Sequence, residues 1–133
     1  MSVVQGLKAA RDRMALHGMC RSRFINQDKQ VCIMGALAVV AFGEEFDSNN
    51  GPYIKLREFG NFDGNPKLAP MMDRLFPFLP EKYQQRGYGK HDGLATWNNE
   101  AAKDTAEVLA LFDKAIIMAI AAEDAQVPQL EVA

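Results

Sequence analysis

The stretch "VCIMGALAVVAFG", residues 31–43, decides the fold of this chain. Positions 33–42 carry no charge, and Gly43 stands where a helix would end. A helix that is apolar on every side belongs in the interior of a domain, so we expect a central helix over 33–42. Gly35 lies inside this helix at a cost of up to about 1 kcal/mol against alanine. Its presence indicates that a neighbouring backbone approaches the helix closely.

The clearest further helix lies in "DTAEVLALFDKAIIMAIAAED", residues 104–124. Asp104 suits the N-cap position, and Glu107 completes a variant of the capping box. The apolar side chains form two adjacent stripes, one of Val108, Leu111, Ala115, Met118 and Ala122, the other of Leu109, Phe112, Ile116 and Ile120. So broad an apolar surface predicts contacts on two sides, and we expect this helix to form the core with the helix over 33–42.

Shorter patterns surround these two helices. Helical spacing over residues 3–14 predicts a first helix that ends near His17 and Gly18. Residues 22–33 are typical of a short hairpin that turns at Gln27 and Asp28. Residues 68–83 predict one or two short helices broken by prolines, whereas residues 44–66 and the polar "QQRGYGKHDG" segment (84–93) predict irregular loops.

Length and composition favour one compact domain. The chain has 133 residues, of which 48% are hydrophobic, enough for a real core. We therefore expect a mainly α-helical bundle, α+β only through the minor hairpin, with long irregular middle loops. The expected domain covers residues 1–126, and residues 127–133 are expected to form a flexible tail.

The sequence shows no recognisable export or membrane signal, and we expect a cytoplasmic protein. The N-terminus does not show the pattern of a signal peptide, and the longest apolar run falls short of the ~20 residues that cross a bilayer. In the expected hairpin, Cys32 would lie opposite Arg23 and not opposite Cys20. A disulfide is therefore not favoured, and reduced thiols are expected.

Cys32 has two possible roles. At the start of a helix its thiol could be activated as a nucleophile, with His91 as base and Asn98 as orienting group, which would make the chain a hydrolase or transferase. Nothing around Cys32 repeats the local signature of a known Cys–His hydrolase family. We favour the alternative, that Cys32 is a small buried residue and that the chain is not an enzyme.

Metal and cofactor motifs are absent or incomplete in the sequence. His17 and Cys20 are spaced like one half of a zinc site, but Cys32 and His91 do not form a second close pair. The glycine-rich signatures of phosphate and dinucleotide binding do not occur. We expect neither a metal nor a cofactor.

Trp97 and Asn98 belong to "LATWNNEAAKDTAEV", before the last helix. They could line a pocket beside His91. We favour a structural role, in which Trp97 anchors a loop and Asn98 satisfies backbone groups in the turn that leads to the Asp104 cap.

Charge is unevenly distributed and bears on partners. Residues 1–32 hold six basic and two acidic side chains, a net +4 in a chain of net −2. We predict a protein that binds another protein, or copies of itself, through the basic first third and the irregular middle, the contact residues being Arg21, Arg23, Tyr53, Lys55 and Arg57. A weak nucleic-acid binder is the alternative, although Phe24 alone is a poor stacking platform.

Three segments, "VCIMGAL" (31–37), "WNN" (97–99) and "EVLALFDKAI" (107–116), together resemble a small uncharacterised family found in actinobacteria and bacteriophages, catalogued as domain of unknown function 6197. The matching positions are Cys32, Gly35, Ala36, Leu37, Trp97, Asn98, Glu107, Val108, Leu111, Asp113 and Ala115. The chain departs from the family pattern at Met19, Asn99 and Asp104, where tryptophan, aspartate and threonine are usual. The resemblance implies a phage or bacterial origin, so that the chain would be a phage-type accessory protein and the bound protein a host or phage protein. It also implies contact between Cys32 and Trp97. It brings no established activity, cofactor or catalytic residues.

Overall fold

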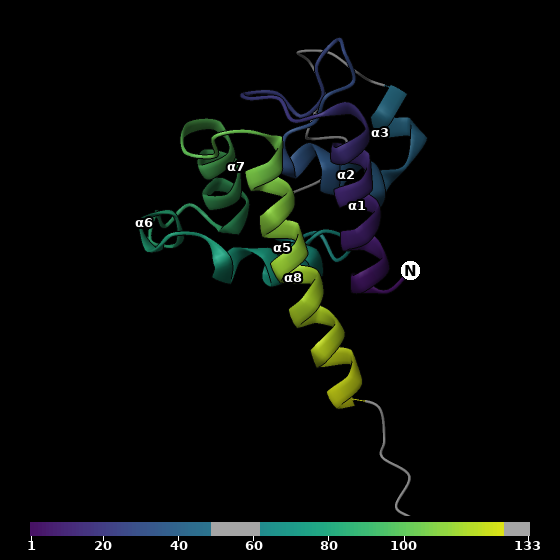
Figure 1. Ribbon diagram of the computed structural model, residues 1–133, viewed down its shortest axis with the longest axis vertical. Helices are drawn as coiled ribbons and strands as arrows, with labels where there is room; N and C mark the ends of the chain where they lie inside the picture. Colours follow the sequence, from purple (N-terminus) through teal and green to yellow (C-terminus); the bar gives the residue numbers. More distant parts are fainter. Residues whose placement is uncertain (49–61, 127–133) are drawn as a thin grey trace, which may run out of the picture.

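The structure is a computed structural model that describes residues 1–48 and 62–126. The described part of the chain folds into helices joined by loops (Figure 1). The prediction of a mainly α-helical chain is confirmed. The elements in chain order are α1 (Val3–His17), α2 (Ile33–Phe42), α3 (Glu44–Ser48), α5 (Ala69–Leu75), the 3-10 helix η1 (Phe76–Phe78), α6 (Glu81–Gln84), α7 (Lys90–Glu100) and α8 (Thr105–Gln126).

Local signals mark both ends of α1 and the end of α2. Ser2 caps α1, and its side chain exchanges hydrogen bonds with Gln5 in a capping box. Helix α1 ends at Gly18 and α2 at Gly43, each with a positive φ that favours glycine. The predicted ends of both helices are therefore confirmed.

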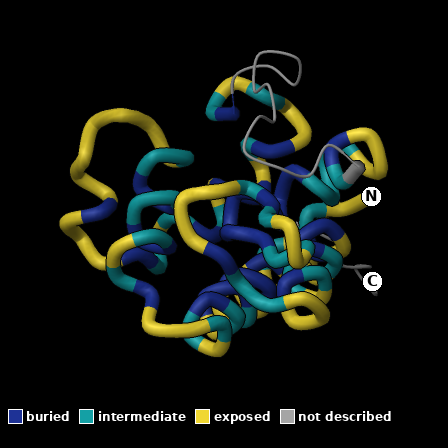
Figure 2. The backbone as a smooth tube through the Cα atoms, turned by 90° about the horizontal axis from the view of Figure 1, so that it is seen from above, coloured by how far each residue is buried: buried dark blue, intermediate teal, exposed yellow. Residues whose placement is uncertain are grey.

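The first six residues of α2 lie in the core. Helix α1 packs against both α8 and α2, while α5 packs against α8 and α7 against α2 (Figure 1). Every residue of Ile33–Ala38 is buried, and the buried stretches of the other helices line the interior (Figure 2). The interior position that the uncharged sequence predicts is therefore confirmed for Ile33–Ala38, whereas residues 39–42 are only half-buried.

The close approach at Gly35 is confirmed. A Cβ atom at this position would lie 1.9 Å from the carbonyl oxygen of Phe24, far inside van der Waals contact. The same carbonyl accepts a hydrogen bond from the backbone N–H of Cys32 at 3.2 Å. A segment without regular structure therefore rests directly on the first turn of α2.

The predicted hairpin over 22–33 does not form a strand ladder in the described residues. Asn26–Gln30 makes a tight turn close to the predicted place, but pairing is limited to isolated bridges of Val31 with Met19 and with Ile25. The reason is that Val31 pairs with two segments. Its own N–H and carbonyl bond to Gly18 and Cys20, whereas its bridge to Ile25 is made by the flanking hydrogen bonds of Asn26 to Gln30 and of Cys32 to Phe24. This leaves no continuous partner for a second strand.

Loop predictions are wrong at three places in the chain. Residues 90–93, expected in a loop, form the first turn of α7, and Trp97–Asn99 are helical instead of lying in the connection to α8. Residues 44–48, expected to be irregular, form α3, whose Phe46 is fully buried. Both helices are short and obtain their stabilisation from tertiary contacts, which local sequence patterns do not show.

The short helices of the middle region follow the prolines. Pro77 lies in the first turn of η1, and Pro80 precedes α6, so the predicted breaks in 68–83 are confirmed. The remainder of the predicted irregular stretch, 49–61, and the predicted tail, 127–133, lie outside the described residues.

Candidate functional site

Cys32 is sealed in the core, where it caps a helix. It is the N-cap residue of α2, and its Sγ accepts a hydrogen bond from the backbone N–H of Gly35 at 3.3 Å. Its side chain is 5% exposed, and burial raises the pKa of the Cys32 thiol to about 12. The thiolate is therefore negligible at neutral pH, and the role that fits is the buried one.

His91 has a different partner from the one that a nucleophilic mechanism needs. It lies in the first turn of α7, where its Nδ1 contacts the carboxylate of Asp63 and its backbone N–H donates to Asp63 Oδ1 at 3.0 Å. Backbone and side-chain hydrogen bonds from His91 hold the pKa of Asp63 below its usual value, against the opposing effect of burial. Within the described residues, no hydrogen bond joins Cys32 to His91.

Asp63 makes a structural contact with α7 that sequence reasoning missed. Gly89, which precedes α7, has no side chain to cap the helix, and a Cβ there would lie 2.2 Å from Asp63 Oδ2. Asp63 thus caps α7 from a distant part of the chain, at the positive end of the helix dipole. No local pattern links the two segments, so the sequence carried no signal for this contact.

Asn98 is the buried polar residue around which the candidate site is built. Its side chain is fully buried. Its Oδ1 accepts from the backbone N–H of Ile33 at 3.0 Å, and its Nδ2 donates to the carbonyl of Cys20 at 3.0 Å. The Asn98 side chain therefore connects α7 to the start of α2 and to the segment before α2. Both its carbonyl oxygen and its NH₂ group are hydrogen-bonded.

Asn99 adds a second contact from α7 to this segment, and Arg21 of the segment contacts α7 in return. Asn99 Oδ1 accepts from the backbone N–H of Ser22 at 2.8 Å. Arg21 in turn donates to backbone carbonyls at the end of α7, at 2.7 Å to Asn98 and 2.5 Å to Ala102. A cation at a helix C-terminus is stabilised by the dipole. The two segments thus exchange side-chain to backbone hydrogen bonds, and we call residues 19–32 the clamped loop.

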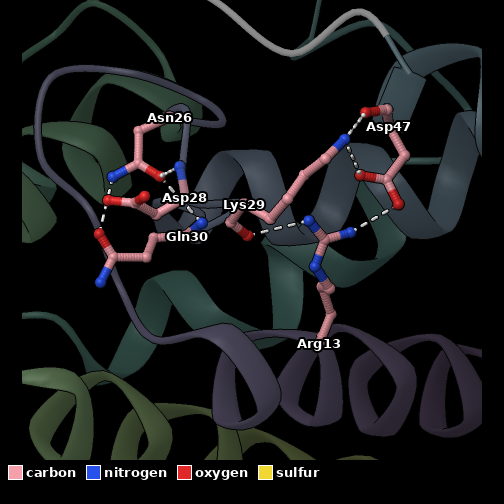
Figure 3. A network of polar contacts seen from close by, with 6 residues as sticks. All are labelled: Arg13, Asn26, Asp28, Lys29, Gln30 and Asp47. Atoms are coloured by element: carbon pink, nitrogen blue, oxygen red, sulfur yellow. Dashed lines mark hydrogen bonds and ion pairs between the residues drawn. The ribbon is translucent and has the colours of Figure 1, made fainter.

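The far side of the clamped loop is tied to α1 and α3 (Figure 3). Arg13 on α1 donates to the Asp47 carboxylate at 2.7 Å and to the carbonyl of Lys29 at 2.9 Å. The ammonium of Lys29 donates to the backbone carbonyl of Asp47 at 2.9 Å. Asn26 closes the tip, because its Oδ1 accepts from the backbone N–H groups of Asp28 and Gln30. The loop is therefore held at both ends and at its tip.

The predicted contact residues fall into three groups. The guanidinium of Arg21 is engaged by α7, so its role in the fold is structural, and a role in binding stays a prediction. Arg23 is exposed at the surface of the clamped loop. Tyr53, Lys55 and Arg57 lie outside the described residues.

The remaining predicted structural residues lie where the core needs them. Trp97 is buried and belongs to the same core as Cys32, while their direct contact stays a prediction. The Asp104 cap is confirmed, since its Oδ1 accepts from the backbone N–H of Glu107 at 2.9 Å. Glu107 reaches back to the N–H of Lys103, one residue before the cap.

Metal-ligand types do not gather in the described part of the chain. The residues 1–48 and 62–126 hold no group of three or more His, Cys, Asp or Glu side chains that could bind a metal ion. Cys20, half of the predicted pair, donates its thiol to the carbonyls of Arg23 and Gln30. Both cysteines are free thiols. Over the same described ranges, no helix is long and apolar enough to cross a membrane.

Comparison with known proteins places the chain in a family. A family model described as "Family of unknown function (DUF6197)" matches residues 1–117. Searches of curated proteins and of solved structures found no significant match. The family match covers α1, the clamped loop, α2, α7 and the first half of α8. The chain therefore belongs to the DUF6197 family, whose function is unknown.

Proposed function

We propose that this chain is a non-catalytic binding protein and that the clamped loop is its recognition surface. The observation that carries the proposal is the reciprocal clamp, in which Asn98 and Asn99 hold the loop backbone and Arg21 holds the backbone of α7. An irregular segment of fourteen residues is thereby presented in one conformation. Binding residues are commonly found on loops that a rigid scaffold positions in this way.

Backbone strain in the clamped loop supports the proposal. Ser22 and Lys29 adopt left-handed conformations, with φ of 62° and 64°, although neither is a glycine. Such conformations are costly and are retained where the surroundings over-determine them, often at functional sites. Here the hydrogen bonds of Ser22 to Asn99 and of Lys29 to Asp47 supply that constraint.

The charge of the loop indicates the kind of partner. Residues 19–32 hold Arg21, Arg23 and Lys29 against one acidic residue, Asp28. Because Arg21 and Lys29 are engaged within the fold, Arg23 is the cation that the loop presents outward. A protein with an acidic surface is the complementary partner. We place this interaction in the bacterial cytoplasm, with a phage-encoded accessory protein acting on a host or phage protein, on the strength of the family resemblance.

The experiment begins with a photoreactive residue at Gln27, on the exposed tip, in a bacterial host. The cross-linked protein is then purified, and its affinity is measured for the unmodified chain, for Arg23→Glu and for Lys8→Glu. Lys8→Glu is a matched control, because it makes the same charge change on an exposed residue of α1. We expect Arg23→Glu to weaken binding at least about tenfold and Lys8→Glu to leave it within about twofold. Equal losses for the two variants, or no specific cross-link, would overturn the proposal.

Two further outcomes identify the alternatives. If the cross-linked species is a nucleic acid and binding falls steeply with salt, the arginine cluster binds nucleic acid instead. If the native protein reacts rapidly with a small alkylating agent at neutral pH, the thiol of Cys32 is accessible and the enzyme alternative returns. We expect labelling to require denaturant, because the thiol is buried and its pKa is raised to about 12.

A further inference from the structure

The second half of α8 carries an apolar surface that the fold leaves uncovered. The last turns of α8 extend beyond the other helices (Figure 1). Ile117, Met118 and Ile120 are 66%, 54% and 38% exposed. Among residues 120–125, which the structure describes, none is buried. The prediction that the apolar stripes of this helix are covered on two sides therefore fails from Met118 onward, although Ala119 itself is buried.

These side chains share one region of the helix surface. Ile117, Ile120 and Ala121 are spaced as i, i+3 and i+4, so they are neighbours on the outer face, and Met118 lies at its edge. Exposed Lys114 lies one turn before this apolar group and exposed Asp124 one turn after it. We call these six residues the distal face of α8. It has an apolar centre with opposite charges at its two ends.

The geometry points to a second copy of this chain as the partner of the distal face, with the two α8 helices packed antiparallel about a two-fold axis at the level of Ala119. In this register, residues equally far before and after Ala119 lie opposite each other. Ile117 then faces Ala121 of the second copy, and Met118 and Ile120 flank this contact on its two sides. Lys114 faces Asp124, and the two-fold axis makes this ion pair twice.

The charges select this arrangement over its alternatives. A parallel pair would place Lys114 against Lys114 and Asp124 against Asp124, which is repulsive. Moving the axis to Ile117 would bring Lys114 opposite Ile120, and moving it to Ala121 would bring Asp124 opposite Met118. Each of these shifts places a charge against an apolar side chain and loses the ion pairs. Charge complementarity therefore favours a second copy in one orientation and one register.

The distal face is separate from the clamped loop. The loop meets α8 at its first residue, where Thr105 Oγ1 accepts a hydrogen bond from the backbone N–H of Met19. Ile117 is twelve residues further along, about 18 Å at the rise of an α-helix. A dimer through the distal face leaves the loop free, so the inference goes beyond the proposed function. A single helix face buries less than the ~800 Å² per partner of a standard interface, so the dimer should be weak and depend on concentration.

Sedimentation velocity of the full chain over a wide range of concentration tests the dimer. We expect monomer and dimer in exchange, with dimer growing as concentration rises. Ile117→Glu should abolish the dimer, because it places a charge at the apolar centre of the face. Leu16→Glu is the matched control, since Leu16 is an exposed aliphatic residue of α1 and lies outside the distal face. It should leave the dimer unchanged.

A charge exchange tests the register. Lys114→Asp alone and Asp124→Lys alone should each weaken dimerisation about tenfold, because each replaces two attractive pairs by two repulsive ones. The double variant, Lys114→Asp with Asp124→Lys, should restore dimerisation to within about twofold of the original. Failure of the double variant to restore it would overturn the register.

Three results would overturn the proposal that a second copy of the chain binds the distal face. These are a chain that stays monomeric at every concentration, a dimer that Ile117→Glu leaves intact, and a dimer that Leu16→Glu disrupts equally. If the chain is monomeric and Ile117→Glu instead weakens binding to the protein cross-linked at Gln27, the face belongs to that partner. None of these results affects the test of the clamped loop by Arg23→Glu.

Discussion

The clamped loop and the distal half of α8 show two opposite ways in which a segment can be ordered. The loop has no helix or strand of its own. Asn98 and Arg13 donate hydrogen bonds to its backbone carbonyls, and Asn99 accepts one from a backbone N–H. The distal half of α8 has the regular hydrogen bonds of a helix, yet its side chains Ile117 and Met118 are left exposed. The loop is ordered by tertiary polar contacts, whereas the distal half of α8 is ordered by hydrogen bonds within the helix. We therefore expect substitutions in the two regions to differ sharply in their effect on stability.

The largest effect is expected at Gly35, where the loop touches α2. Gly35→Ala places a Cβ 1.9 Å from the carbonyl of Phe24, so the loop must move away from the helix. We expect a loss of about 3 kcal/mol or more in the free energy of unfolding, measured by urea denaturation. Gly64→Ala is the matched control, since nothing lies within 4 Å of its Cβ, and it should change stability by less than about 1 kcal/mol. Equal losses would show that the close approach does not constrain the loop.

The next effect is expected at Asn98, the centre of the clamp. Asn98→Ala leaves the buried N–H of Ile33 and the carbonyl of Cys20 without their partner. An unpaired buried polar group costs about 1–3 kcal/mol, so we expect a loss of about 3 kcal/mol in the same assay. Amide hydrogen exchange should accelerate in residues 19–32.

Asn99→Ala is the comparison for Asn98→Ala. Its bond to the N–H of Ser22 is exposed, so water can replace the side chain, and we expect a loss below about 1 kcal/mol. A larger loss for Asn99→Ala than for Asn98→Ala would contradict burial as the source of the clamp's strength.

A smaller, pH-dependent effect is expected at Asp63, the tertiary cap of α7. Its pKa is lower in the folded than in the unfolded chain, so its contribution is present above the unfolded pKa of about 3.9 and is lost as pH falls through the folded pKa. Because the pair is partly exposed to solvent, we expect the contribution to be below about 1 kcal/mol.

Denaturation at several pH values between neutral and acidic measures this contribution. Asp63→Asn should be less stable than the original chain at neutral pH, and the difference should shrink as the solution is acidified. A difference that stays constant over this range would show that the charge of Asp63 does not contribute to the free energy of unfolding.

The smallest effect on the stability of the single chain is expected at Ile117. Ile117→Glu removes an exposed side chain and keeps a residue compatible with a helix, so the free energy of unfolding of dilute protein should change by less than about 0.5 kcal/mol. The same variant should abolish the dimer. A loss comparable to that of Asn98→Ala would mean that Ile117 packs within its own chain, and the contrast between the two regions would disappear.

Local signals predicted the helices whose ends and apolar periodicity lie in adjacent residues. Gly18, Gly43 and Asp104 marked helix ends correctly, because capping depends on residues within one turn. Gly35 predicted a close approach, although nothing in the sequence identified Phe24 as the neighbour. The site was harder to predict. Asn98 was recognised as a residue that satisfies backbone groups, but the groups it satisfies lie 65 and 78 residues away.

By itself, the sequence determined that the chain is mainly α-helical and that the start of α2 is buried, because charge-free segments of helical length have to avoid water. It favoured a buried Cys32 over a reactive one, and the structure shows Cys32 buried. Tertiary structure alone decided the rest. It brought Asp63 to the start of α7, divided the pairing of Val31 so that no ladder forms among the described residues, and connected the clamped loop to the end of α7. The physical reason is that a capping or periodic signal acts over one or two turns. A hydrogen bond between distant segments depends on how the whole chain packs.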